Sequence, residues 1–296
     1  MPVNSPVFQD QALANPVATQ MREIVPGIHR VEGFFPIQIQ AIQTTRNGGI
    51  SSPPYDDLNF GHHVGDDPKS VSQNRQRLAQ VSHTELIWLD QVHGTHVTAH
   101  MSGLAGKADC RADAIVTDQQ GRGCLVMTAD CLPLLIARPG HHQVAAVHAG
   151  WRGLCDGVIE AAMDRLVADG SSRSRNSADS PMDGWWIWLG PAIGPKAFEV
   201  GDDVRAAFLA RDNASEIGFM SRPGVPGKWL ADLQLLARLR LQSWFNAHRR
   251  RSARSASEVE IHVAQQNDCV FTMAERYFSY RRDHVTGRMA SLISLI

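Results

Sequence analysis

Short apolar segments alternate with longer helical patterns along most of the chain, and this alternation most restricts the folds that the sequence can adopt. Alternating or continuously apolar segments predict strands, and leucines at helical spacing predict helices. Strands are expected at 37–45, 85–92, 114–117, 125–129, 134–137, 144–147, 185–189 and 260–264. Helices are expected from Pro68 to about Val81, capped by Asp66 or Asp67, and at 154–168, 203–210 and 230–248. This order indicates an α/β fold, in the mixed α+β sense.

Residues 1–30 differ from the rest of the chain, because they are rich in Gln, Asn, Pro and Ala and show no clear period. We predict a flexible extension there and a single domain at 31–296, since no break in composition divides the remainder. The segment 170–184 is predicted to be a surface loop. The basic run 249–257 is predicted to be a solvated linker, because no aromatic residues interleave with its arginines as in a nucleic-acid patch.

Charge and cysteine content restrict the partners and the compartment. The 29 Lys+Arg nearly cancel the 30 Asp+Glu, giving a net charge of -1, so no global field attracts nucleic acid or anionic lipid. The 5 cysteines are odd in number and scattered, which favours reduced thiols. No apolar run suits a signal peptide or a membrane span. We expect a cytoplasmic protein without a nucleic-acid or membrane partner; the oligomeric state stays open.

Several familiar active sites are excluded by their spacing requirements. The sequence contains no GxxxxGK[ST], GxGxxG, HExxH, GxSxG or CxxC motif. The missing PCxxC argues against a zinc site of the cytidine-deaminase type. No His-x-His pair occurs among the 13 histidines, so the many-histidine copper centre of a true laccase would be hard to build. A copper polyphenol oxidase is therefore disfavoured.

Three residues that can bind a soft or borderline metal stand at the ends of predicted strands. His93 follows the strand at 85–92, Cys131 follows the strand at 125–129, and His148 ends an apolar strand before Gly150. Two imidazoles and a thiolate at one point would suit Zn²⁺ with an open fourth position. Each residue also has an ordinary explanation, since a buried cysteine commonly packs as a small hydrophobe. The other cysteines are expected to be structural, namely Cys110, Cys124, Cys155 and Cys269.

A series of dense segments resembles the YfiH-type family of laccase-domain, or polyphenol oxidase, proteins. The resemblance covers roughly residues 35–296 and is specific because all the segments occur in the family's order. They are TRNGGISSPPYDDLNFGHHVGDDP (45–68), WLDQVHG, RADA, MTADCLPLL, AAVHAGWRGL, WLGPAIGPKAFEVG and YFSYRRDHVTGRMASLI (277–293).

The resemblance implies both a fold and an activity. The fold would be a two-sheet mixed β-sandwich flanked by helices, related to deamidase-toxin domains, with residues 31–296 as the catalytic domain. The cofactor would be Zn²⁺ held by His93, Cys131 and His148, with Cu²⁺ as a possible substitute. The activity would be phosphorolysis of adenosine, inosine, guanosine and methylthioadenosine, together with deamination of adenosine. The partners would thus be small purine nucleosides and phosphate.

The remaining chemistry needs a proton carrier and an anion site. Zinc-bound water has a pKa near 7 and would attack C6 of adenine. Asp130 is the first candidate for the general base, or alternatively a carboxylate that orients a ligand imidazole. Arg46, before two glycines, is the best candidate for binding phosphate; Arg152 is a second, or else forms a buried structural pair. Ribose or phosphate contacts are also expected from Ser51, Asn59 and His63.

Two other function classes remain open at this stage. Cys131 could be a nucleophile activated by His148, in a hydrolase that edits a peptidoglycan precursor. A non-catalytic zinc protein would instead need a closed four-ligand site, for which the sequence offers no fourth ligand at a matching spacing. Zinc stoichiometry and the reactivity of the thiol would separate these classes.

Overall fold

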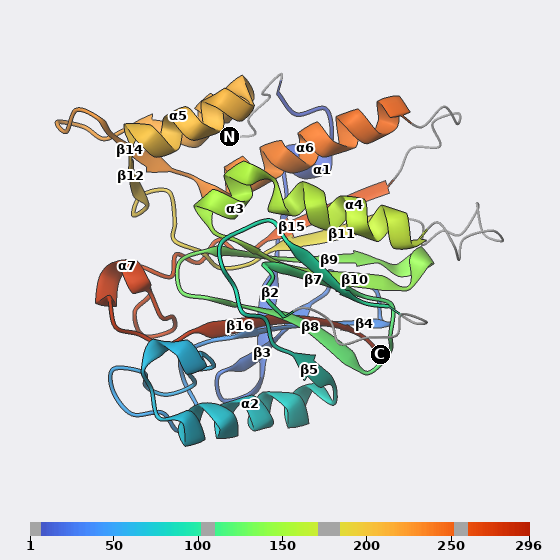
Figure 1. Ribbon diagram of the computed structural model, residues 1–296, viewed down its shortest axis with the longest axis vertical. Helices are drawn as coiled ribbons and strands as arrows, with labels where there is room; N and C mark the ends of the chain where they lie inside the picture. The colour runs from blue at the N-terminus through green and yellow to red at the C-terminus, as the bar shows by residue number, and fades with distance from the viewer. Residues whose placement is uncertain (1–6, 102–109, 171–183, 252–259) are drawn as a thin grey trace.

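The computed structural model describes residues 7–101, 110–170, 184–251 and 260–296. Figure 1 shows two large sheets stacked in the middle of the molecule, with α4 and α6 above one sheet and α2 below the other. The mixed two-sheet sandwich flanked by helices that the family resemblance implies is therefore confirmed. Residues 171–183 of the predicted loop and 252–257 of the basic run lie outside the described residues, whereas 249–251 belong to the preceding helix and not to a linker.

Both large sheets are mixed, and a small third sheet accompanies them. The seven-stranded sheet has the order β1 (Val17–Ala18), β15 (Glu260–Gln265), β11 (Gly184–Leu189), β9 (Leu132–Arg138), β10 (Gln143–Ala149), β7 (Ala114–Thr117), β6 (Val97–His100). The six-stranded sheet has the order β2 (Gln20–Val25), β3 (Ile28–Glu32), β4 (Ile39–Thr44), β16 (Met289–Leu295), β8 (Arg122–Thr128), β5 (Glu85–Ile87). The small sheet contains β12 (Glu199–Gly201), β14 (Lys228–Ala231) and β13 (Phe219–Ser221).

Helices cover both outer faces of the sandwich, and the short α7 lies at one end of it (Figure 1). They are α1 (Gln11–Ala14), α2 (Pro68–Ser82), α3 (Trp151–Asp156), α4 (Val158–Gly170), α5 (Asp202–Arg211), α6 (Leu233–Arg251) and α7 (Tyr280–Asp283), with 3-10 turns at His62–Val64, Pro139–His141 and Asn213–Gly218. The start of α2 is as predicted, since the Asp67 carboxylate accepts hydrogen bonds from the main-chain N–H groups of Lys69 and Ser70. Within the described residues, no helix has the length and apolar character needed to span a bilayer.

Alternation along the central strands creates three apolar layers. On β10, Ala146 faces the layer between the two sheets, whereas Val147 faces the layer beneath the helices, where it joins Ile159 of α4. On β8, Leu125 faces α2 and packs in one cluster with Leu78. Strands buried on both faces explain why the sequence segments at β8, β9 and β10 are apolar without interruption.

Several boundaries differ from the sequence predictions. The predicted flexible extension at 1–30 is wrong from residue 20 onward, because β2 pairs with β3 and β3 pairs with β4. The predicted helix at 154–168 is two helices, because Gly157 adopts a left-handed φ of 106° between α3 and α4. The predicted strand at 85–92 ends at Ile87, so His93 lies in a connection and not at a strand end.

Candidate metal centre

His93, Cys131 and His148 come together at one end of the sandwich. His148 is the penultimate residue of β10, Cys131 ends the turn between β8 and β9, and His93 lies in the connection between β5 and β6. Their ligand atoms all lie within 4.8 Å of one another. The Cys131 Sγ is 3.8 Å from the His93 Nε2, and the two imidazole centroids are 4.8 Å apart. The structure therefore forms the three-residue cluster that the sequence predicted.

The backbone around the cluster is unusually constrained. His93 has a φ of 60° and Asp130 a φ of 104°, in the left-handed region that non-glycine residues rarely adopt. A Cβ atom at Gly150 would lie 2.7 Å from the His93 ring and 3.2 Å from the Cys131 Sγ. Glycine at position 150 thus lets the chain pass behind the two ligands. Strained torsions of this kind concentrate at functional sites.

One buried carboxylate, Asp113, connects two of the three candidate ligands. Its Oδ1 is 2.8 Å from the His148 Nδ1, so that the other ring nitrogen of His148 is left for a metal. The same carboxylate accepts hydrogen bonds from the main-chain N–H groups of Val92, His93 and Gly94, at 3.2, 2.9 and 2.7 Å. Asp113 therefore orients one ligand and holds the turn that carries another.

Asp113 is fully buried. Burial acts to raise its pKa, but hydrogen bonds from His148 and from the main chain outweigh burial and hold the pKa below its usual value. Asp113 thus remains a carboxylate at neutral pH.

Electrostatics favour a thiolate at Cys131. Burial by itself raises the pKa of the thiol, but the adjacent His148 and His93 lower it to about 6. Burial likewise lowers the pKa of His148, whereas Cys131 and Asp113 raise it to about 9. Without a metal, the pair is a thiolate beside an imidazolium. The thiolate is the form of cysteine that both binds metals and attacks electrophiles.

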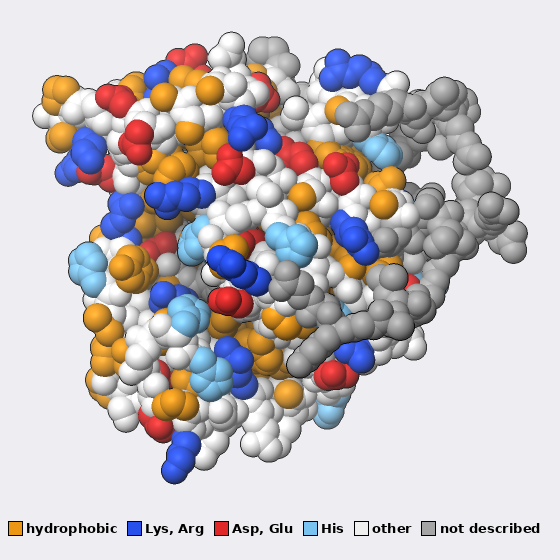
Figure 2. Space-filling view, in the orientation of Figure 1, with side chains coloured by type: hydrophobic (Ala, Val, Ile, Leu, Met, Phe, Trp, Pro, Cys, Tyr) orange, Lys and Arg blue, Asp and Glu red, His pale blue; other side chains and the backbone are white. Residues whose placement is uncertain are grey.

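The cluster opens into a cavity of about 410 Å³. Its walls combine apolar and aromatic side chains with polar and charged ones. They are His63, Gln91, Met127, Thr128, Ala129, Asp130, Ile193, Phe198, Tyr280, Arg281 and Arg288, besides the three candidate ligands. Figure 2 shows histidine and Lys or Arg side chains among hydrophobic ones on the face that lies between α3 and α2.

Asp130 lies in the wall of this cavity, as a candidate base requires. Its carboxylate accepts a hydrogen bond from the Ser279 hydroxyl and one from the Arg281 main-chain N–H, both at 2.6 Å. Burial raises the pKa of Asp130, although these hydrogen bonds oppose the change. The alternative role of orienting a ligand imidazole belongs to Asp113 and not to Asp130.

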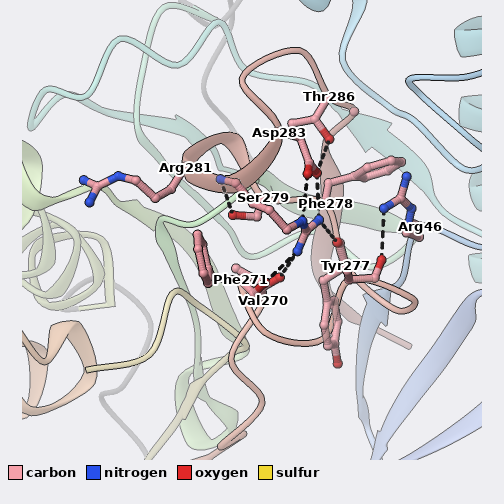
Figure 3. Close-up of polar contacts among 12 residues, drawn as sticks. Arg46, Val270, Phe271, Tyr277, Phe278, Ser279, Arg281, Asp283 and Thr286 are labelled. Carbon is pink, nitrogen blue, oxygen red and sulfur yellow. Dashed lines mark hydrogen bonds and ion pairs between the residues drawn. The ribbon is translucent and has the colours of Figure 1, made fainter. Parts of the chain in front are cut away.

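Arg46 does not reach the cavity. Its Nε donates to the Asp56 main-chain oxygen at 3.0 Å, its Nη1 donates to the Ala274 main-chain oxygen at 2.9 Å, and its guanidinium stacks on Phe278. Figure 3 shows Arg46 beside the segment that precedes α7. The predicted phosphate-binding arginine is instead a clamp between two loops, because all its nitrogens have partners on the protein.

The other predicted contact residues separate into two groups. His63 lines the cavity. Arg152 is exposed, stacks on Trp151 and is not among the lining residues, so it forms no buried pair and lies outside this cavity. Ser51 and Asn59 are buried: the Ser51 hydroxyl accepts a hydrogen bond from Asn74 of α2, and the Asn59 amide donates one to Asp66 in the loop that precedes α2. They hold that loop and do not line the cavity.

Sequence reasoning did not single out Asp113, which orients His148, or the cavity-lining residues Arg288, Tyr280 and Gln91. All four lie in segments that carry the family resemblance, namely RADA, WLDQVHG and YFSYRRDHVTGRMASLI (277–293). The signal was thus present, but spacing alone could not say which of these side chains meet.

Comparison with known proteins assigns the family. A family model described as "Multi-copper polyphenol oxidoreductase laccase" matches residues 40–296. The Escherichia coli protein named purine nucleoside phosphorylase YfiH is 43% identical over 266 residues, which cover 88% of this chain and 96% of that protein. The chain belongs to the YfiH family. A Pseudomonas aeruginosa protein that is also named a purine nucleoside phosphorylase is 42% identical over 261 residues, covering 88% of this chain and 95% of its own.

Solved structures of YfiH-type proteins show the same fold over nearly the whole chain. A Neisseria meningitidis protein matches with a TM-score of 0.73 at 36% identity, covering 91% of this chain and 99% of that one. YlmD from Geobacillus stearothermophilus also matches with a TM-score of 0.73, at 28% identity, covering 95% and 99%. The family that the sequence motifs indicated is therefore confirmed.

The donor set of this YfiH-family chain fits a borderline-soft metal ion. Two imidazole nitrogens and a cysteine sulfur lie within 4.8 Å of one another, and one imidazole is already oriented by a buried carboxylate. Within the part of the chain that the structure describes, this is the one such group of metal-binding side chains. Three protein ligands leave one coordination position open, as catalytic sites do.

Proposed function

We propose that the protein is a metal-dependent purine nucleoside phosphorylase whose centre is Zn²⁺ held by His93, Cys131 and His148. The observation that carries the proposal is the placement of these three donors on the floor of a cavity of about 410 Å³, which is large enough for a nucleoside. The names of the Escherichia coli and Pseudomonas aeruginosa relatives support the reaction class. A Cys and two His suit zinc better than magnesium or calcium.

The cavity walls supply the contacts that a nucleoside needs. Phe198, Ile193 and Tyr280 offer apolar and aromatic surface for a flat purine. Arg281 and Arg288 offer positive charge for an anionic co-substrate. With this division, the base would lie against the apolar wall and the phosphate beside the arginines.

In phosphorolysis, a phosphate oxygen forms a bond to C1′ of the ribose while the C1′–N9 bond breaks. The electron pair of that bond goes to the purine, and the proton lost by hydrogen phosphate ends on the free base. Bound Zn²⁺ would supply a Lewis acid with one open position. Asp130 is the group placed to move the proton, since burial raises its pKa and it lies in the cavity wall.

Adenosine deamination is the second reaction that we assign to the same centre. It exchanges the C6 amino group for oxygen from water and releases ammonia, so it needs no phosphate. Adenosine should therefore give inosine in phosphate-free buffer. Addition of phosphate should then release free base and ribose 1-phosphate.

The test combines metal analysis with a product screen on adenosine, inosine, guanosine and methylthioadenosine, with and without phosphate. We expect about one zinc per chain and phosphate-dependent release of free base. Full activity in metal-free protein would refute the metal dependence. Failure to release base from any of the four nucleosides would refute the reaction class.

A cysteine hydrolase, such as one that edits a peptidoglycan precursor, is a second candidate, and one observation favours it. Cys131, His148 and Asp113 form a nucleophile, a base and an orienting carboxylate in a row. Such a triad would act without any metal.

Alkylation of Cys131 by iodoacetamide separates the two candidates. In metal-free protein, labelling should rise as pH increases through about 6, because the thiolate is the reactive form and His148 and His93 lower the pKa of the thiol. Cys124 should stay unlabelled in the folded protein, since it is fully buried and burial raises its pKa. Zinc should protect Cys131 under our proposal. Hydrolysis of amide substrates by chelated protein, abolished by labelling, would instead favour the hydrolase.

A further inference from the structure

Arg288 is a cation in the cavity wall whose hydrogen-bonding capacity is largely unused. Only its Nη1 has protein acceptors among the described residues, the main-chain oxygens of Thr286 and Gly287, both at 3.0 Å. Within that same part of the chain, no carboxylate oxygen lies within ion-pair distance of its guanidinium. Nε and Nη2 therefore remain as two parallel donors of the kind that bind a phosphate or carboxylate bidentately.

Neighbouring arginines differ from Arg288, because their guanidinium donors are occupied by partners on the protein. Arg282 donates to the main-chain oxygens of Val270, Phe271 and Tyr277 and pairs with Asp283. Arg46, beside Tyr277 and Phe278 in Figure 3, likewise donates to main-chain oxygens of the protein. These two arginines stabilise loops, whereas Arg288 lines the cavity with donors to spare.

The position of Arg288 is fixed from two directions. Its main-chain N–H donates to the Asn59 Oδ1 at 2.9 Å, and Asn59 in turn is held by donation to Asp66 at 2.8 Å. Gly61 makes room for its side chain, since a Cβ at that position would lie 2.9 Å from the Arg288 Cγ. An arginine with an ordered stem and two unused donors loses little conformational freedom when it binds an anion.

The surroundings of Arg288 favour an anion at this place. His63 and Arg281 line the same cavity, and Tyr280 lies 5.9 Å from the guanidinium. Asp130 and Cys131 are close enough to act on Arg288 electrostatically, but the Asp130 carboxylate is already bound to Ser279 and Arg281. A half-buried cation without its own carboxylate partner is compensated best by a ligand that brings negative charge.

From this geometry we infer that Arg288 is the residue that binds inorganic phosphate next to the metal centre, with Asn59 as a positioning residue. The inference rests on the proposed phosphorolysis. It replaces Arg46 as the anion-binding arginine. It also gives Asn59 a function that its burial away from the cavity would not otherwise suggest.

The test is a kinetic split in the zinc-loaded protein. Arg288→Gln should raise the KM for phosphate about 10- to 100-fold, because two charge-assisted hydrogen bonds are lost. The KM for inosine should change less than about twofold, and the zinc content should not change, since Arg288 is not a ligand. Arg288→Lys keeps the charge without the fork and should give an intermediate KM. Arg211→Gln, which removes an exposed arginine on α5 paired with Asp156, should behave as wild type.

Binding of inorganic phosphate, measured by calorimetry without nucleoside, gives a second readout. Wild-type protein should bind phosphate, and the Gln variant should bind it at least about tenfold more weakly. An unchanged KM and unchanged phosphate affinity in Arg288→Gln would overturn the inference while leaving phosphorolysis intact. Phosphate binding by the wild type without any base release would instead refute the proposed function and leave the phosphate site standing. If Arg288→Gln fails to fold, the KM for phosphate and the phosphate affinity of Arg288→Lys test the inference instead, and values equal to those of the wild type would overturn it.

Discussion

The two walls of the cavity are built in different ways. On the ligand side, turns at 92–94 and 129–131 hold the donors through left-handed torsions, a close-packed glycine and one buried carboxylate. On the opposite side, the short helix α7 and the residues before β16 present long side chains that lie partly in solvent. The first wall is fixed by main-chain geometry, whereas the second is formed by long side chains that are partly exposed. Metal binding and substrate preference should therefore respond to different mutations.

Loss of a ligand should have the largest effect. Cys131→Ser and His148→Ala should each weaken zinc binding more than about 100-fold and abolish base release. This loss exceeds the one expected when a residue that only hydrogen-bonds to a ligand is replaced. Zinc content after dialysis and a phosphorolysis assay measure both. Cys155→Ser is the matched control: Cys155 lies on α3, where it is buried in the core, so this variant should keep metal and activity. An inactive Cys155→Ser with active Cys131→Ser would show that the centre is elsewhere.

Asp113→Asn should come next. We expect zinc affinity to fall about 10- to 100-fold, because the amide cannot orient the His148 imidazole or hold the 92–94 turn as a carboxylate does. Competition with a chromophoric chelator measures this change. Asp130→Asn is the contrast, since it should lower turnover without releasing the metal.

Asp113→Asn should also change how the stability of the metal-free protein depends on pH. The pKa of Asp113 is lower in the folded protein than in the unfolded chain, so its contribution to stability is present above about pH 4 and is lost as pH falls further. Urea unfolding of Asp113→Asn should therefore depend less steeply on pH below 4 than that of the wild type. The same pH dependence of unfolding in the variant and the wild type would show that Asp113 does not contribute to the loss of stability in acid.

Tyr280→Leu should have the smallest effect. Tyr280 is 55% exposed and lines the cavity from α7, so its loss should raise the KM for nucleosides about two- to fivefold with normal zinc content and folding. Steady-state kinetics on inosine and guanosine measure it. A loss of metal in this variant would contradict the independence of the two walls.

The sequence predicted the ligands better than their supports. His148 and Cys131 follow long apolar strands, and the family motifs single them out with His93. Asp113 could not be assigned in the same way, because its partners are 35 residues away at His148 and 20 residues away at His93. Arg46 was mistaken for a ligand-binding arginine since the glycines after it suggest an anion loop, whereas its real acceptors are main-chain oxygens as far away as Ala274.

The N-terminal strands were missed for a similar reason. The segments QMREIV and IHRVE mix charged and apolar residues, because most side chains of the edge strand β2 and several of β3 are only partly buried. Such a strand lacks the continuous apolar run that marked β8, β9 and β10. Its stability comes from pairing with β3, which no local pattern reveals.

The pairing of β3 with β4 also affects how the chain tolerates shortening. The family match begins at residue 40, whereas β3 ends at Glu32 and bonds along one side of β4 from Ile42 to Thr44. A protein trimmed to the matched residues would expose that side of β4 as a bare sheet margin with unpaired N–H and C=O groups. The exposed edge strands of two copies would then pair with each other. The trimmed protein should therefore aggregate, although every proposed catalytic group is still present.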